Sequence, residues 1–355
     1  MEKSQSREKS QSREIVSFIL QTLSGNPQTI SKITSEKFGI TRQAVNRYIK
    51  KLLKDGVVEA TGATRDRAYK LKDIVSKSYR LPIKPDLEED RVWRQEIKHL
   101  FTSVPANVLD ICQYGFTEIL NNVIDHSEGH TVEITIKLTA ANIEMRIGDD
   151  GIGIFHKLKN LLGFEDYRHA ILELTKGKLT TDPDHHTGEG IFFTSRMFDL
   201  FSISTGQLRF LHSKSGDSWL IEDSEGEHGK GTLVYMQIST FSSETAQTLF
   251  NRYTSDDNNY GFTKTRVPVS LLKYGEESLV SRSQAKRLVA RFDRFKEVSL
   301  DFQGITTIGQ AFADEIFRVY QKQNPQIEIV WVNANQEVAK MIRKALSDNA
   351  TISTI

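Results

Sequence analysis

Residues 118–126 read EILNNVIDH, and this stretch decides how the middle of the chain is interpreted. Glu118 and Asn122 are four residues apart, so on a helix they lie one turn from each other on one face. The Asn122 amide offers a neutral oxygen, a ligand that magnesium accepts while it keeps several waters and bridges substrate phosphates. Glu118 is suited to orient or deprotonate a nucleophile nearby. The spacing therefore predicts a base beside a metal ligand.

A first glycine pair follows in the segment RIGDDGIGI, residues 146–154. An alternating, strand-like run precedes the pair, so Gly151 and Gly153 fall at a strand end, where the backbone turns sharply. Asp149 is then expected to project into a pocket and to accept a hydrogen bond from an adenine amino group. An Asp-Gly pair alone is usually a turn with local hydrogen bonds, so this assignment depends on the neighbouring motifs.

A second glycine pair, Gly188 and Gly190, precedes the apolar, helical run 191–198. The free N–H groups and the positive dipole end at the start of such a helix suit a phosphate. Alone, a glycine pair before a helix is more often a plain turn. The order of the three motifs along the chain is what predicts an ATP site.

The three motifs resemble the N, G1 and G2 boxes of the GHKL (Bergerat-fold) ATPases, a superfamily that includes histidine kinases and anti-sigma serine kinases. The resemblance covers residues 95–240 and implies a central Bergerat-type α/β sandwich with ATP and Mg²⁺ as cofactors. Glu118 corresponds to the catalytic residue and Asn122 to the metal ligand. Residues 229–235, GKGTLVY, resemble the closing strand, whose Thr232 lies near the adenine. The cofactor-binding set is Asn122, Asp149, Gly151, Gly153, Lys178, Thr187, Gly188, Gly190 and Thr232. A histidine eight residues after Glu118, His126, resembles the pattern of the anti-sigma kinase branch. The alternative is that His126 only packs against the helix end or caps it.

Residues 155–187, between the second and third motifs, are expected to hold a lid over the nucleotide. Their apolar spacing predicts two short helices, followed by a polar, turn-rich stretch that becomes ordered over bound phosphates. Lys176 and Lys178 are candidates to reach phosphate. The alternative is that both lysines are simply solvated.

Composition sets the limits on the rest of the chain. Its 355 residues are enough for two or three domains. The single cysteine, Cys112, excludes an internal disulfide framework and fits a reducing compartment. No signal-peptide segment and no apolar run of membrane-spanning length is visible, so a cytoplasmic location is expected.

The positive charge is concentrated at the N-terminus. Residues 1–73 hold 15 Lys and Arg against 8 Asp and Glu, a balance of 15 − 8 = +7, whereas the whole chain carries +1 and the remainder 1 − 7 = −6. The hexapeptide EKSQSR occurs twice, in residues 2–7 and 8–13. It has no apolar residue, so we expect residues 1–13 to form a solvated tail or a frayed helix extension.

Residues 14–73 follow with three helical, amphipathic patterns and a strand hairpin. Thr41 is expected to cap the third helix. This arrangement resembles a winged helix-turn-helix domain, whose third helix enters the major groove of duplex DNA. The resemblance implies DNA contacts from Arg42, Gln43, Asn46, Arg47 and Lys50 on that helix and from Arg65 and Arg67 on the turn. The alternative is a protein-docking or dimerisation module with solvated lysines.

The C-terminal quarter alternates strands and helices. We assign residues 74–94 to a linker, 241–275 to a connector and 276–355 to a small α/β domain that resembles STAS domains. Gln310 stands where the anti-anti-sigma STAS domains carry a phosphorylatable Ser, although Thr306 and Thr307 are close by. This departure favours an interaction domain that contacts a second copy, a protein partner or the ATPase lid.

The predicted fold class is therefore multidomain α+β, with a winged helix, a Bergerat-type sandwich and a STAS-like domain. The predicted function is transcriptional regulation, in which Mg-ATP binding and slow hydrolysis control a DNA-binding winged helix. The alternative is an anti-sigma-type serine/threonine kinase that acts on a partner or on its own STAS-like domain.

Overall fold

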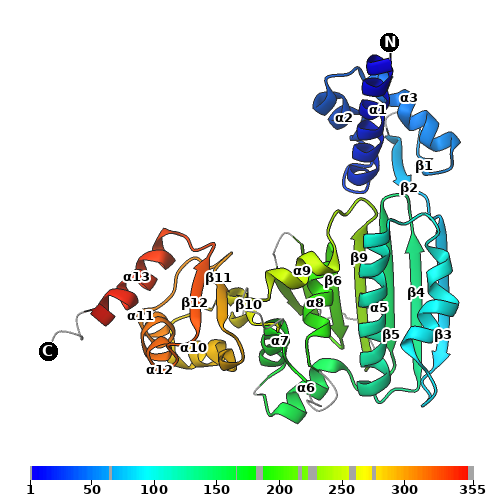
Figure 1. Cartoon of the computed structure of the whole chain (residues 1–355). Coiled ribbons are helices and arrows are strands. Elements are labelled where there is room, and N and C mark those ends of the chain that lie inside the picture. The colour runs from blue at the N-terminus through cyan, green and yellow to red at the C-terminus, as the bar shows by residue number, and fades with distance from the viewer. Residues whose placement is uncertain are drawn as a thin grey trace.

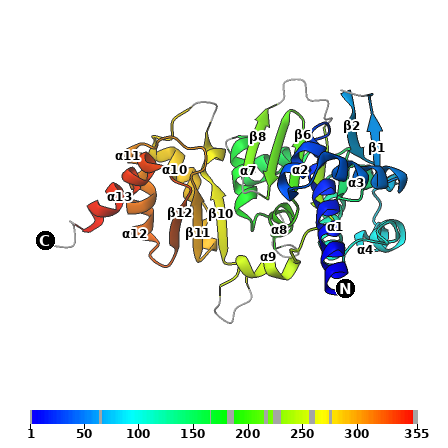
Figure 2. The same ribbon diagram turned by 90° about the horizontal axis from the view of Figure 1, so that it is seen from above.

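Three parts follow one another along the chain, and Figure 1 shows them as an upper lobe, a central body and a domain to one side. The computed structural model describes residues 2–63, 66–164, 166–180, 187–214, 218–222, 230–255, 261–273 and 277–350. Viewed from above, the N-terminal lobe lies over the central body, and the C-terminal domain lies beside it (Figure 2). No helix in the described ranges is long and apolar enough to cross a membrane.

The N-terminal lobe is a winged helix-turn-helix, as the sequence predicts. It consists of α1 (Glu2–Thr22), α2 (Ile30–Phe38), α3 (Arg42–Lys54) and the antiparallel pair β1 (Val58–Thr61) and β2 (Ala68–Leu71). The Thr41 side chain accepts a hydrogen bond from the Ala44 N–H and so begins α3. Val45, Ile49 and Leu52 recur at helical spacing and are buried. The duplicated hexapeptide continues α1, which agrees with a helix extension rather than a separate tail.

The central body is a seven-stranded antiparallel sheet in the order β3-β4-β5-β9-β6-β7-β8. Its strands are β3 (Val75–Pro82), β4 (Thr131–Leu138), β5 (Asn142–Asp149), β6 (Leu200–Thr205), β7 (Leu208–Ser213), β8 (Ser218–Glu222) and β9 (Thr232–Ser239). The long helix α5 (Ala106–His126) packs against β5, β9 and the shorter helix α8 (Gly190–Met197). Alternate residues of β4 and β5 are buried, as an amphipathic strand requires.

Residues 74–94 are not a linker, which corrects the boundary expected from the sequence. β3 pairs with β4 along its whole length, from Val75 opposite Leu138 to Pro82 opposite Thr131. α4 (Glu89–Val92) then continues into a π-helical turn, Trp93–Ile97, and the Trp93 side chain is completely buried. The central domain begins at β3 because this edge strand and this tryptophan complete its sheet and its core.

The C-terminal domain begins earlier than position 276, because part of the expected connector belongs to its sheet. β10 (Lys264–Pro268), β11 (Glu297–Asp301) and β12 (Glu328–Val332) form a parallel three-stranded sheet. Parallel strands need crossover segments, and the helices α10 (Arg282–Val289) and α11 (Gln310–Asp314) begin the two crossovers. A π-helical segment, Glu315–Tyr320, leads into α12 (Gln321–Gln323), and α13 (Gln336–Ala350) follows β12. The rest of the connector contains α9 (Ala246–Arg252).

Two short helices, α6 (Ile154–Leu162) and α7 (Tyr167–Lys176), occupy the segment between the first and second glycine pairs, as expected. In the C-terminal domain, α10 ends at Val289 because Ala290 leaves the helical conformation and Arg291 has a φ of +61°. Buried apolar side chains of the central and C-terminal domains form one continuous core, whereas the winged helix has its own.

Candidate functional site

A cavity of about 300 Å³ lies where α5, α6 and the start of α8 meet the strands β5 and β9. Among the residues that line it are most of those predicted from the motifs: Glu118, Asn122, Asp149, Thr187, Gly188, Gly190 and Thr232. The volume is at the lower end of the range for small-molecule sites, and an apolar lining with a few convergent polar groups is typical of such sites. The separate motifs thus converge on one place in the fold.

The α5 wall carries the predicted base and metal ligand on one face. Asn122 Nδ2 donates to the carbonyl oxygen of Glu118, 2.8 Å away, which leaves Oδ1 as the atom suited to a metal. The Glu118 carboxylate lies against the start of α8: a Cβ at Gly190 would be only 2.0 Å from Glu118 Oε2. Glu118, Asn122 and the N-terminus of α8 therefore all line the same cavity.

Asp149 stands at the end of β5, opposite the α5 wall. Its Oδ1 accepts hydrogen bonds from the N–H groups of Gly151 (2.9 Å) and Thr232 (3.2 Å). Burial raises the pKa of Asp149, although these two hydrogen bonds oppose the shift. The backbone bonds hold the carboxylate in one orientation at the cavity wall.

Gly151 and Gly153 do not line the cavity in the described part of the chain; they shape the turn beside it. A Cβ at Gly151 would lie 2.0 Å from the Ser127 carbonyl oxygen, so only glycine fits this close approach. After Gly153, the Ile154 N–H donates to Thr232 Oγ1 at 2.9 Å and joins the start of α6 to the start of β9. These two glycines therefore shape the turn beside the cavity, and they do not line the cavity as the motif predicted.

Lys176 and Lys178 point away from the cavity, which corrects the expectation that they reach a phosphate. Lys176 is 1% exposed and pairs with the buried Glu173. Lys178 Nζ donates to the carbonyl oxygen of Arg294 in the C-terminal domain, 2.9 Å away. Burial lowers the pKa of Lys178, while the nearby Glu189 opposes the shift. Both lysines donate hydrogen bonds to backbone carbonyl oxygens of the C-terminal domain.

Lys157, which none of the three motifs contains, lines the cavity from the first turn of α6. Its Nζ donates to the His126 carbonyl oxygen (2.8 Å) and to Glu128 Oε1 (3.0 Å). His126 itself also lines the cavity. Lys157 stands four residues after Gly153, on the first helical turn beyond the glycine pair. This spacing is the sequence signal that could have identified it.

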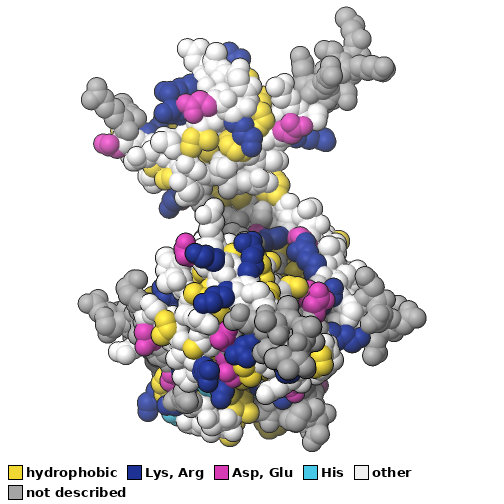
Figure 3. Space-filling model, turned by 90° about the vertical axis from the view of Figure 1, so that its left-hand side faces the viewer, with side chains coloured by type: hydrophobic (Ala, Val, Ile, Leu, Met, Phe, Trp, Pro, Cys, Tyr) yellow, Lys and Arg dark blue, Asp and Glu magenta, His cyan; other side chains and the backbone are white. Residues whose placement is uncertain are grey.

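A second candidate surface lies on the winged helix. The side chains expected to contact DNA from α3 are all exposed: Arg42, Gln43, Asn46, Arg47 and Lys50. Asn46 Oδ1 accepts a hydrogen bond from Ser31 Oγ, 2.9 Å away, and the Arg67 guanidinium lies over the Tyr69 ring. Arg65 lies outside the described residues. Figure 3 shows this domain as a lobe with Lys and Arg side chains, joined to the body by a narrow neck.

Comparison with protein families identifies the two terminal parts. Residues 19–59 match the model of a winged helix-turn-helix DNA-binding domain. Residues 284–339 match the model of a STAS-like domain of unknown function. No GHKL family model matches the central segment. A search of curated proteins finds no match to this chain.

Proposed function

We propose that the central cavity binds Mg-ATP and that its occupancy controls how the winged helix engages duplex DNA, in a transcriptional regulator with slow ATPase activity. The observation that carries the proposal is convergence. Glu118 and Asn122, Asp149, the Gly188–Gly190 turn and Thr232 come from separate segments of the chain and line one cavity. Each segment alone is compatible with an ordinary turn or helix, whereas their meeting favours a ligand site.

The roles follow from the chemistry of each wall. Asn122 Oδ1 is the proposed Mg²⁺ ligand, and Glu118 is the proposed base that activates a nucleophile beside the terminal phosphate. Asp149 accepts a hydrogen bond from the adenine amino group, and the N–H groups at the start of α8 hold phosphate. The Glu118 carboxylate lies against Gly190 at the start of α8, and Glu189 stands between the two glycines of this turn. Phosphate binding there therefore depends on the metal cation.

The proposed DNA contacts use the exposed face of α3. Gln43 and Asn46 read base edges in the major groove, while Arg42, Arg47 and Lys50 contact phosphates. Arg65 and Arg67 contact the backbone or the minor groove from the wing. The concentration of positive charge in residues 1–73 supports DNA rather than a neutral protein surface as the partner.

Calorimetry on the full chain with Mg²⁺ and a non-hydrolysable ATP analogue tests the nucleotide site. Asn122→Ala should abolish Mg²⁺-dependent binding, because it removes a ligand used in the ground state. Glu118→Ala should keep binding and lose turnover, because a base acts mainly on the transition state. Asn160→Ala, at an exposed position of α6, is the matched control and should bind as the wild type does. No binding by the wild type, or unchanged affinity in Asn122→Ala, would overturn the proposal.

The kinase alternative has one observation in its favour: Thr306 and Thr307 are exposed hydroxyls in the C-terminal domain, close to the start of α11. Incubation with ATP labelled on the γ-phosphate separates the two functions. Release of free phosphate supports the ATPase. Label on Thr306 or Thr307 that disappears in Glu118→Ala establishes the kinase instead.

A further inference from the structure

The cavity wall includes a short segment that the C-terminal domain holds in place. Leu179 and Thr180 line the cavity directly after Lys178. The Gly188 turn, which also lines it, has a φ of +70° and packs so closely on Leu179 that a Cβ there would lie 2.5 Å from the Leu179 carbonyl carbon. The shape of this wall therefore depends on where the backbone at residues 178–180 is placed.

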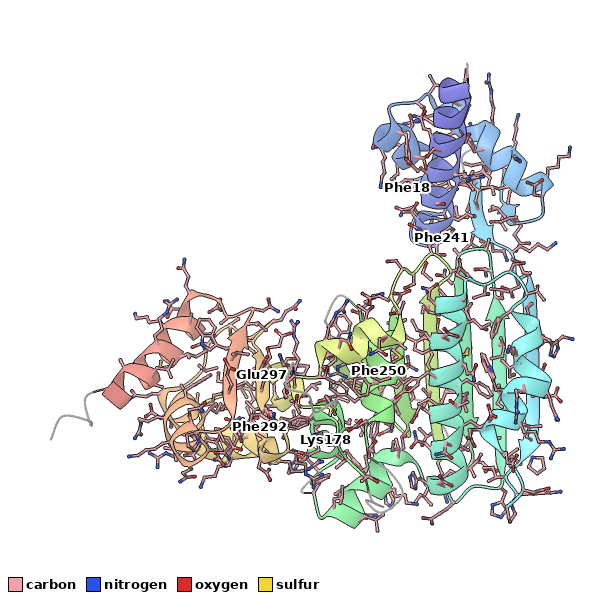
Figure 4. The ribbon with its side chains drawn as sticks, in the orientation of Figure 1. Phe18, Lys178, Phe241, Phe250, Phe292 and Glu297 are labelled. Atoms are coloured by element: carbon pink, nitrogen blue, oxygen red, sulfur yellow. The ribbon has the colours of Figure 1, made fainter. Side chains whose placement is uncertain are left out.

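Two arginines of the C-terminal domain fix that backbone. Arg291 Nη2 and Arg294 Nη1 both donate to the Lys178 carbonyl oxygen, at 2.5 Å and 2.7 Å. Lys178 Nζ donates back to the carbonyl oxygen of Arg294 and lies over the rings of Phe262 and Phe295. Figure 4 shows Lys178 at the boundary between the two domains, on the side of Phe292. Hydrogen bonds with a charged donor are the stronger ones in proteins, so this is a firm attachment.

The backbone is strained at both ends of this contact. Lys178 has a φ of +54° and Arg291 a φ of +61°, values that residues other than glycine rarely adopt. Such conformations persist only where the surrounding structure imposes them, and they cluster at ligand sites and switch regions. Here the two strained residues are hydrogen-bonded to each other across the domain boundary.

A buried ion cluster anchors Arg291. Arg291 Nη1 lies 3.0 Å from Oε2 of Glu173, whose side chain is completely buried in α7, and Lys176 pairs with Oε1 of the same carboxylate. Lys176 Nζ also donates to the carbonyl oxygen of Ala290 at 2.8 Å. Burial lowers the pKa of Lys176 to about 8, against the opposing effect of Glu173. Burial alone would raise the pKa of Glu173, but the His169 hydrogen bond and the cations Lys176 and Arg291 outweigh it and lower the pKa.

We propose that Arg291 and Arg294 are positioning residues of the nucleotide site: they hold residues 178–180 in the conformation that a nucleoside triphosphate requires. The inference rests on the proposed function, because it assumes that the cavity binds this ligand. Nucleotide binding and docking of the C-terminal domain are then thermodynamically coupled, so each makes the other more favourable by the same free energy. A bound nucleotide stabilises the docked C-terminal domain, and loss of the dock weakens the nucleotide.

The test measures affinity for Mg²⁺ and a non-hydrolysable ATP analogue by calorimetry in the full chain. Arg294→Ala changes an exposed side chain, so folding is preserved, and affinity should fall about tenfold, which corresponds to roughly 1.4 kcal/mol. Arg294→Lys should restore part of the affinity, because an ammonium can still donate one hydrogen bond to the Lys178 carbonyl oxygen. Arg343→Ala, exposed on α13 of the same domain, is the control and should bind normally.

Hydrogen exchange supplies the reciprocal readout. The analogue should slow backbone amide exchange in residues 286–295 of the wild type, and this protection should be lost in Asn122→Ala, where the nucleotide does not bind. The inference is overturned if Arg294→Ala and Arg291→Lys both bind the analogue with wild-type affinity and if the analogue does not slow amide exchange in residues 286–295 of the wild type. The nucleotide site itself would then still stand. A wild-type protein that binds no nucleotide overturns the proposed function first, so the two failures are distinguishable.

Discussion

The C-terminal domain shares one continuous buried core with the central sheet, whereas the winged helix meets that sheet through a small contact at the β4–β5 turn. At the first junction, the completely buried Glu173 joins α7 to Arg291. At the second, Ala141 is the buried residue of the turn that packs into the winged-helix core, and Phe241, at the neck in Figure 4, is 38% exposed. The chain crosses this second junction in the short stretch between Leu71 of β2 and Val75 of β3.

The two junctions also lie at different distances from the cavity. β5 begins at Asn142, next to the winged helix, and ends at Asp149 in the cavity wall. Its length is roughly 25 Å at about 3.4 Å per residue. A nucleotide bound as proposed would therefore contact a cavity wall that is attached to the C-terminal domain. Its effect on the winged helix would have to pass along the strands that connect the two ends of the sheet.

The largest effect is expected from breaking the C-terminal junction. Glu173→Ala leaves the buried Lys176 and the partly buried Arg291 without their shared carboxylate, so the free energy of unfolding should fall by about 3–5 kcal/mol. Urea unfolding of the full chain measures it. The control is Glu59→Ala, which removes the exposed Glu59–Lys70 pair on the wing and should have little effect, since surface pairs contribute little. Equal effects of the two variants would mean that the buried cluster does not hold the junction.

The next effect tests whether DNA binding is confined to the lobe beyond the thin junction. Arg42→Ala with Arg47→Ala should lower the affinity for duplex DNA about tenfold or more at physiological salt. It should also flatten the log–log dependence of affinity on salt by about 1.8, because each phosphate contact contributes about 0.9. Fluorescence anisotropy across a salt series measures both quantities.

The matched control for this pair removes two positive charges from exposed positions of the C-terminal domain, Arg282→Ala with Arg343→Ala. It alters the net charge equally and should leave the salt dependence unchanged. An equal loss of affinity in the control would show that DNA responds to overall charge. No DNA affinity of the wild type at low salt would favour a docking module.

The comparison also shows what the sequence can and cannot reveal. The Thr41 cap and the spacing of Glu118 and Asn122 are local signals, and the structure agrees with the elements they predict. β3 escapes detection because an edge strand exposes most of its side chains, so the segment resembles a polar linker. The contact of Lys178 with Arg294 is not visible in the sequence, because the two residues are 116 positions apart in the chain. Contacts of that range arise from how the domains pack, which local spacing does not encode.

A smaller effect is expected from breaking the N-terminal junction. Ala141→Asp places a charge at a position that is 1% exposed, which should cost about 1–3 kcal/mol of docking free energy. Nucleotide affinity should stay unchanged, while the difference in DNA affinity with and without nucleotide should shrink. Ser347→Asp adds the same charge at an exposed position of α13 and serves as the control. A preserved nucleotide effect on DNA binding in Ala141→Asp would exclude this junction as the route.

The smallest effect concerns two neighbouring carboxyl groups at the cavity end of β5, whose contributions to stability should change with pH in opposite directions. Burial raises the pKa of Asp149 above its ordinary value of 3.8, so the folded protein binds more protons there than the unfolded chain. This contribution to stability is present at low pH and is lost as the pH rises through the raised pKa. Asp149→Asn should therefore become more favourable for stability, relative to the wild type, as the pH rises from 3.8 through the raised pKa. The same substitution should weaken adenine recognition.

Asp150 supplies the opposite case one residue later. Hydrogen bonds from the Thr131 N–H and hydroxyl and from the His130 N–H lower the pKa of Asp150 to about 2. Its contribution to stability is therefore present above pH 3.8 and is lost as the pH falls through about 2. Asp150→Asn should lower the melting temperature at neutral pH, and the difference from the wild type should vanish on acidification. Thermal melts of both variants without nucleotide, between pH 2 and pH 7, measure the two slopes. Slopes of the same sign would show that these two carboxyl groups do not differ in environment as a partly buried cavity wall and an exposed turn do.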